Sequence, residues 1–415
     1  MKTMKLALLG TAALAAVTVS ARADDVAALK AQLEALNARV AQLEAAPAVP
    51  AGYQLLTITE ADSHSTPAHL LDEPAYRNPI KSVTRIGILP TADAPASTVI
   101  EWSGFVRAAL VYTDFDGAYP GADGVFGTAD DFGTGDELDI LSRAQIQVVG
   151  KTDTAVGEVG VQVRVRGNFD GGGNATAVIP DGTYGWWKMT PELTFSGGYI
   201  GSLGNIGYGY DGACTCEYTD NADVSLNPGD VTQLRVTYES GPILAAIAIE
   251  DASAFGIGDA DADGDQDGTY AGITRPDSLG AAAELKYTGD TFNGEISAVW
   301  RDGDTGDDLW AIGLGVGVSL GDMANLSVGT AVGQYFGGED FWRASALIGF
   351  NLSDAVRAEL AYGHTENDVS NDVDAVLAGI YYEPVSQLRL GLEGEWIDTG
   401  PNDGIVVDFV TRWSF

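Results

Sequence analysis

Apolar and polar residues alternate with a period of two along most of the chain after Glu101. In "VQVRVRGNF", residues 161–169, three valines share one parity, and Gln162, Arg164 and Arg166 share the other. In "LWAIGLGVGVSL", residues 309–320, large apolar side chains alternate with Ala, Gly and Ser. Successive side chains of a β-strand point to opposite faces, so each segment predicts a strand with one apolar face.

We count sixteen such segments, and an even number is typical of a membrane barrel. They are 101–112, 138–150, 156–169, 182–189, 192–200, 231–240, 242–251, 278–288, 291–301, 308–320, 325–335, 341–352, 355–364, 373–382, 386–397 and 405–415. Short links such as "SGP" and "TGD" take turns with longer acidic loops. Short turns on one side and long loops on the other predict an all-β fold, a 16-stranded antiparallel transmembrane β-barrel over residues 101–415.

The parity also predicts which face meets lipid. Sixteen strands enclose a lumen too wide to fill with side chains, so the apolar face must point outward and the arginines inward. Aromatic residues near strand ends suit interfacial girdles; they are Trp102, Trp300, Trp310, Trp342, Tyr382, Trp396 and Trp413. In the last segment, "VVDFVTRWSF", we expect Trp413 and Phe415 to face lipid and the strand to pair with 101–112.

The first 100 residues differ from the rest. Lys2 and Lys5, an apolar run over 6–19 and Ala21-Arg22-Ala23 predict a signal peptide, residues 1–23, cleaved after Ala23. A transmembrane anchor helix fits this segment less well than a signal peptide, because the apolar run is shorter than the roughly 20 residues that span a bilayer.

A helix is expected over residues 24–46, where apolar residues recur at heptad spacing: Val26, Leu29, Leu33, Leu36, Val40 and Leu43. An amphipathic helix packed on its own domain is one interpretation, and an oligomerising periplasmic coiled coil is the other. We favour the coiled coil, because a Pro-rich periplasmic linker, residues 47–100, follows and offers little core. Short strands are possible in this linker around 55–59 and 86–89.

Composition narrows the function classes. Gly accounts for 53 of 415 residues, which fits many strands joined by Gly-rich loops. The net charge is −37, from 22 basic and 59 acidic residues, and it becomes −40 when Lys2, Lys5 and Arg22 are removed. So acidic a surface repels nucleic acid, and we exclude nucleic-acid binding.

The chain resembles the outer-membrane porins of α-proteobacteria, of the Rhodobacter, Brucella and Rhizobium type, from about Trp102 to Phe415. The resemblance rests on "SGFVRAAL", on "TQLRVTYESGPILAAIAIED" and on the closing "VSQLRLGLEGEW" and "VVDFVTRWSF". It implies a homotrimer in outer-membrane lipid and lipopolysaccharide, with periplasmic termini, that passes small hydrophilic solutes. It also implies a third external loop folded into the pore, and a terminal residue, Phe415, read by the barrel-assembly machinery.

The third external link is "GSLGNIGYGYDGACTCEYTDNADVSLNPGD", residues 201–230. A link of this length is functional or disordered. It carries five carboxylates, Asp211, Glu217, Asp220, Asp223 and Asp230, and no basic residue. Across the lumen we expect the inward arginines Arg107, Arg143, Arg164, Arg166 and Arg235. Opposed charges would create a transverse field at a constriction, whereas the alternative is an exposed acidic loop.

The same link holds the two cysteines, Cys214 and Cys216. An oxidising periplasm favours a disulfide, and a metal pair is the other interpretation.

Two acidic runs are candidates for structural Ca²⁺. "DADADGDQDGTY", residues 259–270, opens like a calcium loop but has Tyr270 at the twelfth position, so it is not an EF-hand. The candidate ligands are Asp259, Asp261, Asp263, Asp265 and Asp267 in this run, and Asp123, Asp130 and Asp131 in the other. Solvated acidic loops are the alternative, and we expect no other cofactor.

We do not expect an enzyme, because the three histidines, His64, His69 and His364, form no legible cluster with Ser or Asp. The favoured function is a porin, weakly cation-selective, for passive diffusion of small hydrophilic solutes and ions. The alternatives are a substrate-selective channel and a structural barrel that tethers the outer membrane to the cell wall.

Overall fold

The computed structural model describes residues 56–61, 64–67, 70, 82–88, 98–116, 135–169, 179–180, 182–219, 228–251, 279–303, 307–336 and 338–415. All of them belong to the second of two compact units, Leu56–Phe415. The expected signal peptide and the expected helix over 24–46 lie outside the described residues. Within the described ranges, no helix is both long enough and apolar enough to cross a membrane.

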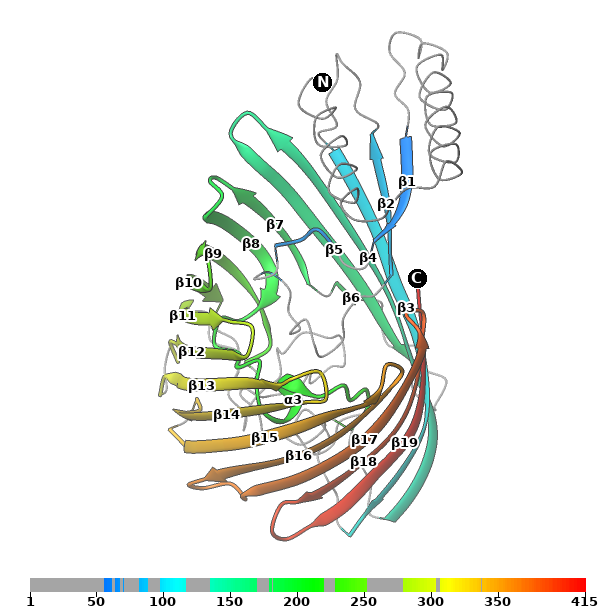
Figure 1. Ribbon diagram of the computed structural model, residues 1–415. Helices are drawn as coiled ribbons and strands as arrows, with labels where there is room; N and C mark the ends of the chain where they lie inside the picture. Colours follow the sequence, from blue (N-terminus) through cyan, green and yellow to red (C-terminus); the bar gives the residue numbers. More distant parts are fainter. Residues whose placement is uncertain are drawn as a thin grey trace, which may run out of the picture. The chain divides into compact units, whose positions relative to one another are not determined.

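Sixteen antiparallel strands form a closed barrel, in which each strand pairs with its neighbours in the chain (Figure 1). They are β3 (Thr98–Phe115), β4 (Gly135–Thr154), β5 (Gly157–Phe169), β7 (Thr183–Lys188), β8 (Leu193–Gly201), β9 (Asp230–Ser240), β10 (Ile243–Asp251), β11 (Leu279–Thr288), β12 (Phe292–Arg301), β13 (Leu309–Leu320), β14 (Ala324–Gln334), β15 (Asp340–Ser353), β16 (Val356–Asn367), β17 (Val373–Val385), β18 (Leu388–Asp398) and β19 (Asp403–Ser414). The predicted fold is confirmed, and most predicted strands begin and end within three residues of the observed ones.

The outer surface carries the apolar parity. Trp310, Ile312 and Leu314 of β13 are exposed, and Ala311 and Gly313 between them are buried on the lumen face. The seven aromatic residues expected at the outer surface are all exposed, at 37–50% of their surface. A continuous exposed apolar surface of this kind is stable only against lipid.

The barrel closes between its last and first strands. β19 pairs with β3 from Ser414 opposite Phe105 to Gly404 opposite Phe115, as expected. Phe415 continues this ladder, since its N–H donates to the Gly104 carbonyl at 3.0 Å and its own carbonyl accepts from the Gly104 N–H at 3.2 Å. A Cβ at Gly104 would lie 2.8 Å from the Phe415 ring, so the ring requires glycine at this position.

Within the described residues, three further strands lie outside the sixteen. β1 (Leu56–Ala61) pairs with β2 (Val83–Ile88), and β2 pairs with β3 over Trp102–Val99, beyond the point where β19 ends. The two-residue β6 (Ile179–Pro180) pairs with β5. The short strands expected in the linker around 55–59 and 86–89 are therefore present, as residues 56–61 and 83–88, and they form a hairpin that pairs with β3. This hairpin pairs with the first residues of β3, which begins three residues before the predicted strand.

Candidate functional site

The connection between β8 and β9 folds into the barrel. Its described residues are 202–219 and 228–229, and the first of these ranges contains the short helix α3 (Tyr210–Ala213), which Figure 1 shows inside the ring of strands. We call residues 202–219 the inner loop. The inner loop lies close to the wall because glycines of the wall, which have no side chain, leave room for it. A Cβ at Gly317 would lie 2.7 Å from the Tyr208 ring, and one at Gly329 would lie 2.5 Å from the Tyr208 carbonyl.

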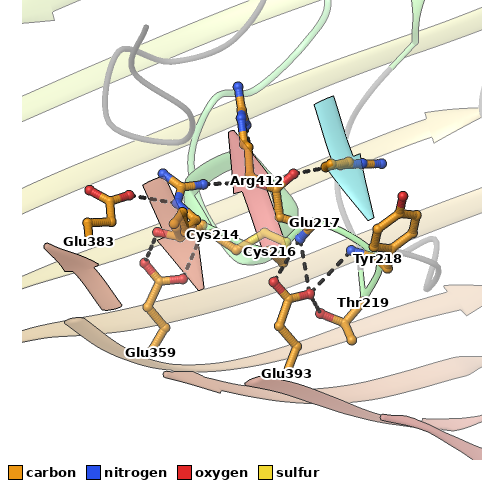
Figure 2. Close-up of polar contacts among 12 residues, drawn as sticks. Cys214, Cys216, Glu217, Tyr218, Thr219, Glu359, Glu383, Glu393 and Arg412 are labelled. Atoms are coloured by element: carbon orange, nitrogen blue, oxygen red, sulfur yellow. Dashed lines mark hydrogen bonds and ion pairs between the residues drawn. A yellow bond between two sulfur atoms is a disulfide. The ribbon is translucent and has the colours of Figure 1, made fainter. Parts of the chain in front are cut away.

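Side chains of the wall accept hydrogen bonds from the backbone of the inner loop. Glu359 of β16 accepts from the Thr215 N–H at 2.7 Å, and Glu393 of β18 accepts from the Glu217 N–H at 3.0 Å (Figure 2). At the start of the loop, Glu250 of β10 accepts from the Leu203 N–H at 3.2 Å. Each bond satisfies a backbone donor that would otherwise be buried without a partner.

Hydroxyl groups extend the same docking along the loop. The Tyr210 N–H donates to the Ser345 Oγ at 2.9 Å, and the Tyr210 hydroxyl donates to Glu395 at 2.7 Å. The Gly209 N–H donates to the Ser327 Oγ at 3.0 Å. The inner loop is therefore bound to the part of the wall that runs from β10 to β19.

Four arginines form a row across the closure of the barrel. Arg389 lies opposite Arg412, Arg412 opposite Arg107, and Arg107 opposite Arg143, on β18, β19, β3 and β4. Adjacent strands are about 4.8 Å apart, so like charges in direct register repel one another. Such a row needs an anion beside it.

Glu217 of the inner loop supplies that anion. Its carboxylate accepts from Arg107 at 2.7 Å, from Arg389 at 2.9 Å and from Arg412 at 3.1 Å, and the Glu217 side chain is fully buried. Figure 2 shows Glu217 beside Arg412, with the Cys214–Cys216 disulfide next to it. Burial acts to raise the pKa of Glu217, but Arg412, Arg107 and Arg389 outweigh it and hold the pKa far below its ordinary value.

The structure thus brings two of the predicted constriction residues, Glu217 and Arg107, into direct contact rather than onto opposite sides of an open gap. Arg164 lies 4.0 Å from Asp230. Arg235 is buried and donates to Gln233 at 2.9 Å and to the Gly201 carbonyl. Arg143, Arg164 and Arg166 lie on the lumen faces of β4 and β5 and are partly exposed.

Several predicted residues cannot be placed. Asp211 is in α3, but its side chain is not described. Asp220 and Asp223 lie outside the described residues, as do all eight calcium candidates from 123 to 267. Within the described part of the chain, no group of three or more His, Cys, Asp or Glu residues is arranged to hold a metal ion.

Sequence reasoning did not select Arg389, Arg412, Glu359 or Glu393 as site residues. The signal was present, since all four are charged residues on the lumen parity of their strands. What was missing was the register that aligns Arg389, Arg412 and Arg107, because register is set by pairing between distant segments.

A second group of lumen residues involves a histidine. The His64 Nε2 lies 2.6 Å from the Ser103 Oγ, and the His64 Nδ1 lies 3.4 Å from Glu101. These are the residue types of a hydrolytic triad. However, Ser103 is 2% exposed, and the His64 Nδ1 makes no hydrogen bond to any described residue. In this arrangement the Ser103 hydroxyl is almost inaccessible to solvent.

Comparisons with known proteins found similar solved structures only at low similarity. Among solved structures, a mutant of Rhodobacter blastica porin is 15% identical, with a TM-score of 0.47, over 76% of this chain and 100% of that one. OmpT of Vibrio cholerae is 13% identical, with a TM-score of 0.49, over 79% of this chain and 99% of that one. No family model and no curated protein matches the chain.

Proposed function

We propose that the protein is an outer-membrane porin, a water-filled channel for passive diffusion of small hydrophilic solutes and ions. The observation that carries the proposal is a closed 16-stranded barrel, apolar outside and charged inside, with a loop docked on its inner wall. Arginines on a wall that enclosed only side chains would carry a large desolvation cost, whereas water in the lumen removes it. Arg143, Arg164 and Arg166 are in this position.

The proposed selectivity is weakly for cations, and its source is the acidic loops at the mouth. The whole chain carries a net charge of −37. Glu217 contributes little to cation selectivity, because three arginines neutralise its charge. Within the pore, the arginines of β4 and β5 therefore act against the acidic loops. Screening over about 8 Å at physiological salt limits the loops to the entrance, so selectivity should increase as salt is lowered.

The proposed setting is the outer membrane of a Gram-negative bacterium, with both termini in the periplasm. The signal peptide over 1–23 supports export, and the heptad pattern over 24–46 supports a homotrimer. Outer-membrane lipid and lipopolysaccharide would surround the barrel, and the barrel-assembly machinery would read Phe415. Calcium in the acidic runs 123–131 and 259–267 remains part of this proposal.

A structural barrel with a closed lumen is the second candidate, because two segments occupy the inner wall: the inner loop, and residues 64–67 with Leu70. Liposome swelling with sugars of increasing size separates the two. A porin admits small sugars rapidly and excludes larger ones. Liposomes that contain folded protein yet admit no sugar would contradict the channel and favour the structural barrel.

A further inference from the structure

Residues 64–67 and 70, which we call the strap, cross four strands of the wall. The Ser65 N–H donates to Glu101 of β3 at 2.7 Å, and the Thr66 hydroxyl donates to Gln162 of β5 at 3.4 Å. Leu70 is fully buried, and its carbonyl accepts from the Tyr184 hydroxyl of β7 at 2.6 Å. The wall positions form one row of register, in which Glu101 lies opposite Val149, Val149 opposite Gln162, and Gln162 opposite Tyr184.

This row is on the lumen face. Glu101 shares its parity with Arg107, which contacts the inner loop, while Trp102 on the other parity is exposed. Gln162 is buried between Val161 and Val163, which are exposed on the outer surface. The strap therefore lies inside the barrel.

The wall beneath the strap is apolar where a porin lumen is expected to be polar. Leu70 packs in one cluster with Val149, Tyr184, Trp186 and Ile200, all nearly inaccessible to solvent. Gly160 leaves room for the Trp186 ring, which a Cβ at that position would overlap. Facing water, this patch would lose the free energy of apolar burial, so Leu70 stabilises the strap against the wall.

We propose that the strap forms a second size-selecting constriction, opposite the inner loop; this inference rests on the proposed function. The inner loop is bound to the wall from β10 to β19 and to β3, and the strap to the wall from β3 to β7. On β3 their contacts, Arg107 and Glu101, are six residues apart, roughly 20 Å along the strand. A solute passes the two segments in series, and the strap reduces the cross-section at the end that carries the C-terminus.

The test is single-channel conductance of the full-length protein with Leu70→Asp, against Leu56→Asp as the matched control. The carboxylate that Leu70→Asp introduces would be ionised and could not stay buried against an apolar cluster, so the strap would leave the wall. Leu56 lies on β1 and is 65% exposed, so its replacement should have no effect. We expect Leu70→Asp to raise conductance by about 1.5-fold or more, since open cross-section governs flow through a water-filled pore, and to admit larger sugars into liposomes.

A folded, heat-modifiable Leu70→Asp barrel could instead show the same conductance and admit sugars of the same maximum size as the unaltered protein. That result would overturn the proposed constriction at the strap and leave the proposed channel function intact. If neither the unaltered protein nor either variant forms channels, the proposed porin function is contradicted instead.

A second measurement covers the case in which Leu70→Asp does not fold. Thr66→Cys places a thiol on the strap, where the native residue is 7% exposed. A charged thiol reagent should modify it slowly, and adding Tyr184→Phe, which removes the donor to the Leu70 carbonyl, should speed the reaction. Rapid modification of Thr66→Cys alone would show that the strap is not seated on the wall, and would overturn the proposal.

Discussion

The inner loop and the strap both line the lumen, but different forces hold them. The inner loop is bound by charges and hydrogen bonds, with Glu217 among three arginines and wall glutamates on its backbone N–H groups. The strap is bound by burial of Leu70 against an apolar cluster and by polar contacts at Glu101, Ser103, Gln162 and Tyr184, and its described residues form no buried cluster of ion pairs like that around Glu217.

This difference predicts different responses to mutation. A buried ion pair tolerates substitution poorly. Removal of one partner leaves an uncompensated buried charge and lowers the free energy of unfolding by about 3–5 kcal/mol. Apolar burial is lost in proportion to area, about 25 cal/mol per Å². The inner loop should therefore behave as a fixed part of the pore, and the strap as its more easily displaced part.

The largest effect is expected from Glu217→Ala. It leaves Arg389, Arg412 and Arg107 in register without their anion, so the inner loop should leave the wall and thermal stability should fall. The measurement is the heat-modifiable transition of purified protein together with channel noise. The matched control is Glu383→Ala, because Glu383 also accepts from Arg389, at 2.6 Å, but belongs to the wall and not to the inner loop. Equal stability of the two variants would contradict the assigned role of Glu217.

Acidification should have a smaller effect, confined to low pH. The pKa of Glu217 is depressed in the folded state, so its stabilisation is fully present above the ordinary glutamate pKa of about 4.3 and is lost progressively as pH falls from there through the lower folded value, while the folded carboxylate itself stays ionised until that lower value. Channel noise that reflects docking of the inner loop should therefore not change between neutral pH and about pH 4. A transition centred near pH 4.3, absent from Glu217→Gln, would show that the arginines do not stabilise the carboxylate.

The smallest effect is expected from Cys214→Ser with Cys216→Ser. The disulfide closes a very short ring, so it removes little entropy from the unfolded chain. Thr215 and Glu217 keep their contacts with Glu359 and the arginines, so the inner loop should remain docked. The measurement is the same thermal transition. A loss as large as that caused by Glu217→Ala would show that the disulfide, and not the ion pairs, positions the loop.

The sequence predicts the barrel because its strands have a strict period of two, and the parity of Leu314 against Gly315 is enough to assign faces. The entry of the third external connection into the lumen was implied only by the resemblance to porins, and not by the pattern of the connection itself. The contacts of Glu217 were not predictable from local pattern, because the row of arginines exists only once β18, β19 and β3 are in register.

The strap was missed because residues 64–70 have no periodicity and follow a stretch that resembles a linker. A sequence signal did exist in the wall, where Val149, Tyr184 and Trp186 fall on the lumen parity. Apolar side chains at lumen positions indicate that another part of the chain covers them.

The most direct test of the proposed channel is a planar-bilayer recording of the unaltered, full-length protein. We predict discrete, ohmic conductance steps with a reversal potential that indicates weak cation selectivity, stronger at low salt. Folded, heat-modifiable protein that inserts into the bilayer without conductance steps would contradict an open lumen.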